Sequence, residues 1–359
     1  EWSRTKNQNI AVTFAHTGKR YSVHAGYVNN HIETQENGGV VGEWAIRDTT
    51  FEMPSGVPMK LTNSQAANIY RNHAFFLTQS YALPLQRVTE NDFSLADLST
   101  VYIGHSIEYN VWSKCYTDIP GDYTDERADK DENNVFIPKT SVYYNNWYIN
   151  PYATRDSLCE RRLSNRFFVQ AQPWDRDGVI GTIDGGVGID MYTYSQFSLG
   201  DYLSGKNRRE KRTSYFAYGA IAGKIKKYVD WGADMKVYPS GYRGGDISLG
   251  GHLTLKSYIR SHALILEGRF STEKRSPAYW QENLFSNHYV WSNSLAKENE
   301  TRIEAAFRIP DYALELAAWQ GVVKNKIYYG PTGPGISDVG ILQYDGNVSL
   351  TSLYARKDF

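Results

Sequence analysis

Apolar and polar residues alternate along much of this chain, over stretches of ten residues or more. In one such stretch, Val229, Trp231 and Met235 fall on one face, and Asp230 and Asp234 fall on the other. A period of two residues is typical of a β-strand whose two faces meet different surroundings. The pattern recurs in residues 101–111, 182–192, 246–256 and 302–309. It predicts an all-β protein.

The alternating stretches and the turn signals between them divide the chain into about 13 expected strands. Their ranges are residues 8–16, 20–33, 73–83, 98–116, 158–172, 178–196, 211–223, 229–239, 246–257, 261–272, 287–308, 311–329 and 339–357. Helical periodicity is weak throughout, and residues 64–76 are the best candidate for a helix.

The length of the strands favours a membrane barrel over a soluble sandwich. Sandwich strands usually run about 5–6 residues, whereas transmembrane barrel strands run about 9–11 residues, apolar outward and polar inward. The polar faces combine glycine with charged residues, which suits a water-filled interior. We therefore expect an antiparallel transmembrane β-barrel, and a large soluble β-protein is the alternative.

Short and long connections alternate between these strands, as in outer-membrane barrels with short periplasmic turns and longer outer loops. The long outer loops include residues 34–72, 117–157, 197–210 and 273–286. We expect one domain over residues 1–359, with folded-in parts of loops 34–72 and 117–157 narrowing the interior. An odd number of strands predicts that the sequence is an incomplete piece of a larger barrel.

In a barrel the two faces have opposite environments. The lipid-facing set is Val229, Trp231, Met235, Leu249, Leu253, Leu255, Ile303 and Phe307. The charged residues expected to line the pore are Glu108, Arg166, Asp184, Asp190, Asp230, Asp234, Lys236, Lys256, Glu267, Arg269, Arg302, Glu304, Arg308, Glu315 and Asp345. These are nine acids and six bases, and because fixed charges bias permeation, they predict a weak preference for cations.

The two cysteines, Cys115 and Cys159, fall at the outer ends of two strands that flank one long loop. If they face each other, Ser106 faces Phe168, and the two thiols are candidates for a disulfide that closes a loop of about 45 residues. Two free, unrelated thiols are the alternative.

Composition narrows the function classes. Lys and Arg total 39 and Asp and Glu total 39, so the net charge is zero, whereas a nucleic-acid binder should be clearly basic. Tyr, with 28 residues, dominates the aromatic residues, and amphipathic rings favour apolar–polar boundaries. No apolar run approaches the ~20 residues of a transmembrane helix.

Catalytic and metal motifs are absent from the sequence: it has no Walker loop, no GxSxG, no HExxH and no CxxC. We therefore expect no enzyme activity, no cofactor and no metal. Residues 121–134 are rich in carboxylates but depart from an EF-hand loop at Asn134 and Thr140, so we interpret them as a solvated loop. The basic run 206–212 could bind lipid phosphates, including lipopolysaccharide, and plain solvation is the default.

Six segments occur in an order that resembles the β-barrel porin family of Bacteroidetes-type outer membranes. They are ENGG (36–39), RLSNRFF (162–168), GYRGGD (241–246), NHYVW (287–291), NKIYYG (325–330) and LYARKDF (353–359). The resemblance spans nearly the whole chain and implies a bacterial outer-membrane location and a porin-like role. It does not identify a solute.

The favoured function is a porin-like channel for passive diffusion of small hydrophilic solutes. The alternative is a structural or accessory barrel with a plugged lumen that binds partner proteins. The expected partners are the lipid bilayer, small hydrophilic solutes and other outer-membrane proteins, and no nucleic acid.

Overall fold

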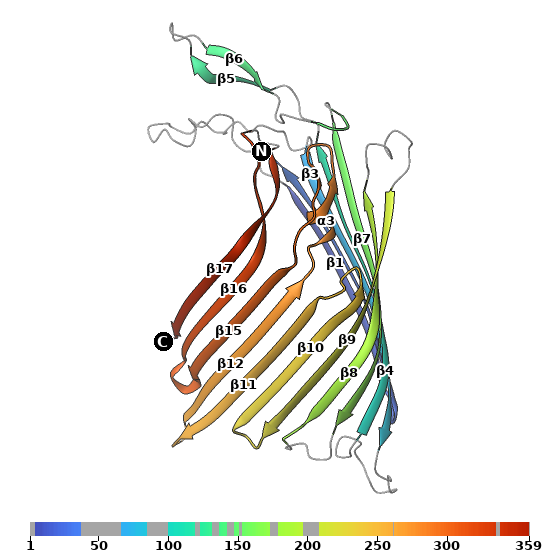
Figure 1. Ribbon diagram of the computed structural model, residues 1–359, viewed down its shortest axis with the longest axis vertical. Helices are drawn as coiled ribbons and strands as arrows, with labels where there is room; N and C mark the ends of the chain where they lie inside the picture. Colours follow the sequence, from blue (N-terminus) through green and yellow to red (C-terminus); the bar gives the residue numbers. More distant parts are fainter. Residues whose placement is uncertain are drawn as a thin grey trace.

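A single curved sheet dominates the structure (Figure 1). The computed structural model describes residues 4–36, 66–84, 100–118, 123–130, 136–141, 147–150, 153–172, 179–196, 208–260, 262–334 and 338–358. Within these residues, 13 strands pair antiparallel, each with the next along the sheet, and β1 and β17 are its two open edges. The expected all-β, antiparallel architecture is confirmed.

The strands of this sheet follow the predicted ranges closely. They are β1 (Thr5–Thr17), β2 (Tyr21–Glu36), β3 (Ala66–Pro84), β4 (Thr100–Asp118), β7 (Thr154–Gln172), β8 (Thr182–Gln196), β9 (Arg208–Ile225), β10 (Val229–Gly241), β11 (Ile247–Ile259), β12 (His262–Arg275), β15 (Glu298–Ile309), β16 (Leu314–Pro331) and β17 (Val339–Lys357). The shortest has 12 residues and the longest have 19, so each is long enough to cross a bilayer when tilted.

Tight turns join the strands at one end of the sheet. Lys226 between β9 and β10, Arg260 after β11 and Ala313 before β16 each have a positive φ, of 52°, 59° and 46°. Ala313 follows a short 3-10 helix, η2 (Pro310–Tyr312). The opposite end carries the longer connections, as predicted, except for the five residues 242–246 between β10 and β11.

Two predictions about individual elements are wrong. Residues 64–76, the helix candidate, fall largely in β3, which pairs along its whole length with β2 and β4. The strand expected at residues 287–308 begins only at Glu298. Residues 276–297 instead form a long loop with a short helix, α3 (Tyr279–Glu282), and two short strands, β13 (Asn283–Phe285) and β14 (Val290–Ser292).

Loop 117–157 contains another separate pair, β5 (Tyr123–Lys130) and β6 (Phe136–Ser141). Most of loop 34–72 lies outside the described residues, so its expected inward folding stays a prediction. None of the helices in the described part of the chain has the length and apolarity that a bilayer span requires.

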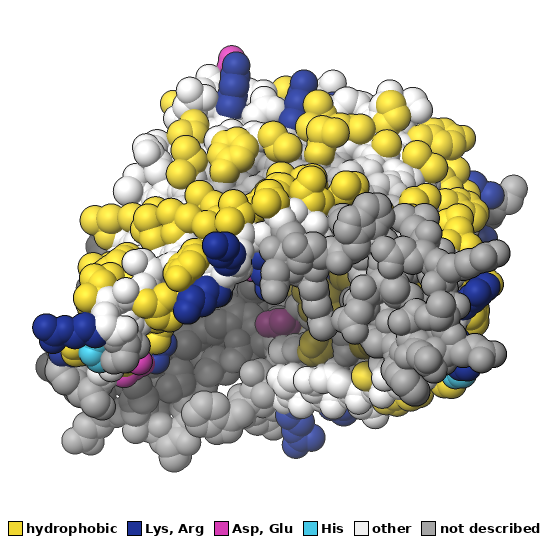
Figure 2. All heavy atoms as spheres, turned by 90° about the horizontal axis from the view of Figure 1, so that it is seen from below, with side chains coloured by type: hydrophobic (Ala, Val, Ile, Leu, Met, Phe, Trp, Pro, Cys, Tyr) yellow, Lys and Arg dark blue, Asp and Glu magenta, His cyan; other side chains and the backbone are white. Residues whose placement is uncertain are grey.

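The register gives the sheet one apolar and one polar face, because side chains of paired residues point to the same side. Met235 pairs with Leu249, and Leu266 pairs with Phe307. Met235 and Leu266 are both 48% exposed. Figure 2 shows such apolar side chains gathered over the outside of the curved sheet, around a hollow. Asp234 and Arg308 alternate with these residues and therefore belong to the opposite face, which we call the inner wall.

Candidate functional site

The inner wall collects the charged residues that the sequence pattern selected. The ladder places on it Glu108, Arg166, Asp184, Asp190, Asp230, Asp234, Lys236, Lys256, Glu267, Arg269, Arg302, Glu304, Arg308 and Glu315. Asp345 lies where the β16–β17 register shifts. Simple alternation therefore does not carry over to Asp345, and its place in the pore stays a prediction.

From β11 to β16 the inner wall is a network of ion pairs, which we call the ion-pair wall. Arg308 Nη1 lies 2.7 Å from Glu267 Oε1, and Arg308 Nε lies 2.9 Å from Glu315 Oε1. Arg302 Nη2 lies 3.2 Å from Glu304 Oε2. Opposite charges therefore neutralise one another across neighbouring strands.

A trough of about 710 Å³ follows this wall. Asp234, His252, Glu267, Arg269, Arg302 and Glu304 are among its lining residues. Its volume is in the range of small-molecule sites, about 300–1,000 Å³, and its lining is polar and charged. Such a surface suits hydrated solutes.

From β7 to β10 the inner wall is built differently, from aromatic rings with cations above them, and we call it the ring wall. Arg166 lies over Phe168 and Tyr218, with its guanidinium carbon 5.4 Å and 5.2 Å from the ring centroids. Lys236 Nζ lies 4.1 Å from the centroid of Phe216. Cations are attracted to ring faces at these distances.

The outer end of the ring wall is covered by residues 276–297, which we call the crossing loop. The loop leaves β12 and passes β11, β10, β9 and β8 in the sheet order before it reaches the start of β7. Tyr279 of α3 stacks on Tyr194 of β8 with the ring centroids 3.9 Å apart. Its hydroxyl donates to Glu210 of β9 at 2.7 Å.

These rings form the best-buried cluster of the described residues. Tyr192, Tyr194 and Tyr279 are 2%, 4% and 4% exposed, and Tyr242 and Trp280 pack against them. Burial, together with the charge of Glu282, raises the pKa of Tyr242 to about 12, so this ring stays neutral at physiological pH. The cluster fixes the crossing loop against the wall by apolar contact.

Asn287 fastens the far end of the crossing loop. Its backbone N–H donates to Asp156 of β7 at 2.8 Å, and its side-chain Nδ2 donates to Thr154 Oγ1 at 2.8 Å. Its Oδ1 accepts from the backbone N–H groups of Ile149 and Asn150, at 3.0 Å and 2.9 Å. Asn287 is 1% exposed, and a buried amide is costly unless its donors and acceptors are satisfied.

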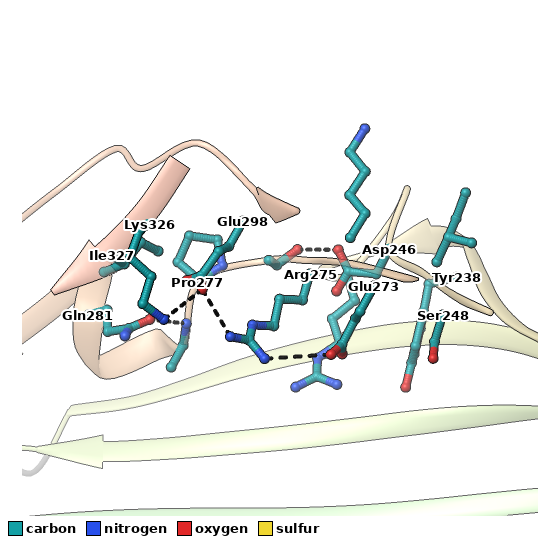
Figure 3. A pocket seen from close by; sticks show the side chains of 15 residues that line it. Tyr238, Asp246, Ser248, Glu273, Arg275, Pro277, Gln281, Glu298, Lys326 and Ile327 are labelled. Atoms are coloured by element: carbon teal, nitrogen blue, oxygen red, sulfur yellow. Dashed lines mark hydrogen bonds and ion pairs between the residues drawn. The ribbon is translucent and has the colours of Figure 1, made fainter. Parts of the chain in front are cut away.

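The near end of the crossing loop is held by charge. Lys297 Nζ lies 2.6 Å from Asp246 Oδ1, and the Ser276 hydroxyl donates to the same oxygen at 2.7 Å. Beside this contact lies a pocket of about 340 Å³ (Figure 3). Arg275 lies there between Glu298, at 3.0 Å, and Glu273, at 3.5 Å. The crossing loop is therefore anchored at both ends.

The predicted disulfide is not formed, because both cysteines are free. The register pairs Cys115 with Ser157 and Ser113 with Cys159, and it pairs Ser106 with Arg166 rather than Phe168. The ladder is thus two residues away from the predicted alignment. Cβ atoms at such diagonal positions lie about 7–8 Å apart, whereas a disulfide needs about 3.5–4.5 Å.

The basic run 206–212 contributes to the crossing loop at its described end. Arg212 pairs with Glu210 on the inner wall and lies over the ring of Tyr242, 5.4 Å from its centroid. Within the described residues, no group of three or more His, Cys, Asp or Glu side chains could hold a metal ion.

Comparison with known proteins identifies the family to which this chain belongs. A family model described as "Putative porin" matches residues 2–359. The chain belongs to this porin family. It is an outer-membrane β-barrel protein, as the sheet with an apolar outer face and a polar inner wall independently indicates. The resemblance seen in its sequence segments is confirmed.

Two other comparisons add less. The structure is similar, with a TM-score of 0.45 and 10% identity, to the crystal structure of the ferric enterobactin receptor PfeA. The alignment covers 98% of this chain and 60% of the receptor chain, so this chain spans less than two thirds of that receptor. No curated protein matches the sequence of this porin-family member significantly.

Sequence reasoning identified the inner wall but missed the crossing loop. The segment that contains Tyr279, Trp280 and Asn287 was divided between an outer loop and a strand. Its density of aromatic residues without alternation, in SPAYWQENLFSNHYVW (276–291), is the signal that distinguishes it from a strand. Its partners lie 131 to 138 residues earlier in the chain, and no local pattern identifies them.

Proposed function

We propose that this porin-family chain forms a channel for passive diffusion of small hydrophilic solutes, narrowed by the crossing loop. The observation that carries the proposal is the loop's path. It lies over the polar face of the sheet and is fastened to strands on the far side of the ring wall. A folded-in loop of this kind limits the size of the solutes that pass and leaves the charged trough beside it accessible.

The charge arrangement supports diffusion rather than tight capture. The acids and bases of the ion-pair wall are paired with one another at 2.7–3.7 Å. Paired charges hold water and interact weakly with passing ions, so conduction does not require a strongly bound intermediate. A surface on which positive and negative side chains alternate accommodates sugars and other neutral polar solutes.

Single-channel recording in planar bilayers tests the proposal. The purified protein should show defined open steps, and Asn287→Ala should increase their size, because the loop loses its attachment to β7. Asn293→Ala is the matched control. In the described part of the chain its side chain donates to the backbone carbonyl of Gln281, inside the loop itself, so the conductance of this variant should stay close to that of the unchanged protein.

Silence of both the unchanged protein and Asn287→Ala would overturn the proposal. It would favour the alternative of a plugged accessory barrel, which should then co-purify with partner proteins. Heat-dependent mobility in gel electrophoresis would show that each variant still forms a folded sheet.

A further inference from the structure

The cations of the ring wall differ from those of the ion-pair wall in what they contact. Arg166 and Lys236 lie over rings, and so does Arg243, which is 5.4 Å from the Tyr192 centroid and 5.7 Å from that of Tyr238. In the described part of the chain none of the three forms an ion pair with a carboxylate. All three are partly exposed.

Two carboxylates of this wall accept hydrogen bonds from tyrosine hydroxyls. Asp190 is 2% exposed and accepts a hydrogen bond from the Tyr238 hydroxyl at 3.0 Å. Asp184 accepts one from the Tyr218 hydroxyl at 3.1 Å. The rings that receive the cations on their faces therefore bind the carboxylates through their hydroxyls. A solute in the hollow cannot reach Asp190, but it can reach the cations.

Two glycines make this arrangement possible. Gly186 lies between Phe168 and Tyr218 in the ladder, and Gly188 lies between Arg166 and Phe216. A Cβ added at Gly186 would stand 2.8 Å from Tyr218 Cε1, so a side chain there would lift the ring off the sheet. The rings lie over the glycines. Arg166 in turn lies over two of the rings, those of Phe168 and Tyr218.

The charges of this wall act together. Among the charged neighbours of Lys236, Asp190 acts on it most strongly, and Arg162, Arg166 and Arg243 act in the opposite sense. Arg162 is paired with Glu108 at 3.0 Å, which leaves Arg166, Lys236 and Arg243 as the cations without such a partner. Like charges that face a hollow and form no direct ion pair with a carboxylate are stabilised by an anion that enters it.

We propose that Arg166, Lys236 and Arg243 form an anion-binding track on the ring wall for solutes that carry phosphate or carboxylate groups. The inference rests on the proposed channel and adds a substrate class to it. A guanidinium presents paired N–H donors to two oxygens of such a group, and a ring face holds the guanidinium plane in position. The track opposes the weak cation preference that the count of acids and bases predicted.

Binding of pyrophosphate by detergent-solubilised protein, measured by calorimetry, tests the track independently of conduction. The double variant Arg166→Gln/Lys236→Gln should bind about tenfold more weakly or worse, because charged hydrogen bonds are lost. The conservative variant Lys236→Arg should retain binding. Arg269→Gln is the matched control, since Arg269 lies in the trough and pairs with Glu267, and it should bind as the unchanged protein does.

Absence of pyrophosphate binding to the unchanged protein, or an equal loss in Arg269→Gln, would overturn the track. Bilayer recording separates this result from failure of the channel. Open steps that pyrophosphate does not interrupt would preserve the channel and reject the track. Binding without any open steps would preserve the track and reject the channel.

Discussion

Both halves of the inner wall carry charged residues on a sheet face that meets water, but they arrange these charges in opposite ways. On the ion-pair wall each arginine lies against an acid of its own or a neighbouring strand, such as Arg308 against Glu267 and Glu315. On the ring wall Arg166, Lys236 and Arg243 lie over aromatic faces, and Asp184 and Asp190 accept hydrogen bonds from tyrosine hydroxyls. Ion pairing cancels the electrostatic field near the surface, whereas aromatic rings that keep bases and acids apart preserve that field.

Tyr279 and Trp280 of the crossing loop pack on the ring wall, and the reason is chemical. Trp291 of the loop meets Tyr329 of β16, with the ring centroids 6.4 Å apart. Tyr192, Tyr194 and Tyr242 give the ring wall an apolar patch at its outer end, where Tyr279 and Trp280 can be buried. The ion-pair wall has charged groups that would lose water under such a cover. A loop can therefore pack closely on rings but not on a field of ion pairs.

The largest expected effect comes from removing the stacking partner of the loop. Tyr194→Ala should weaken docking of the crossing loop by about 3 kcal/mol, as truncation of a large buried aromatic does. The loop should then become sensitive to limited proteolysis. Tyr215→Ala, on the apolar face where Tyr215 is 50% exposed, should leave the loop protected. Equal protection in both variants would show that the rings do not hold the loop.

A charge on the outer face should come next. Ile303 is 60% exposed on the apolar face, and Ile303→Arg should cost about 2–4 kcal/mol if it lies near the bilayer midplane. Ser271→Arg, on the inner wall of the neighbouring strand, is the control and should be nearly neutral. Urea unfolding in phospholipid vesicles measures both, and a neutral Ile303→Arg would contradict the assignment of the two faces.

Breaking the ion-pair wall should have a smaller effect. Glu267→Gln removes the partner of Arg308 and of Arg269, and water-exposed pairs contribute about 0–1 kcal/mol. The same urea titration should therefore show a loss within that range. A larger loss would mean that the ion-pair wall, like the ring wall, is part of the structural core.

The smallest effect concerns pH. Burial raises the pKa of Glu282 above its ordinary value, and the charge of Arg212 offsets part of the shift. A carboxyl whose pKa is raised in the docked loop favours docking below its unfolded pKa and loses that contribution as pH rises through the raised value. Proteolytic protection of the loop should thus increase slightly on acidification, and Glu282→Gln should reduce this change. A steeper response in Glu282→Gln would contradict the assignment.

The sequence was sufficient for the strands and their faces because both follow from a period of two, which is local. Met235 and Asp234 are assigned to opposite faces by being neighbours, and the ladder agrees. Register is less local. The β4–β7 alignment differed from the predicted one by two residues, a shift that preserves the faces but separates Cys115 from Cys159.

The crossing loop lay beyond sequence reasoning for the same reason. Asn287 and His288 form hydrogen bonds with Asp156 and Thr154, and only the assembled sheet brings these residues together. Residues 64–76 misled the helix prediction because both faces of that part of β3 mix polar and apolar residues, as Arg71 and Asn72 illustrate. Near the outer end of β3 neither face is uniformly apolar or uniformly polar.

The fastening of Asn287 sets an order of events during biogenesis. Its partners at Ile149, Asn150 and Asp156 are separated from it by 131 to 138 residues, which include the five sheet strands β8 to β12. Contacts that close such long stretches of chain form late, because their loop-closure entropy must be met by structure already in place. We therefore expect the crossing loop to dock late, after β7 to β12 have joined. On the proposed channel function, docking of this loop is the step that gives a newly inserted molecule its size limit.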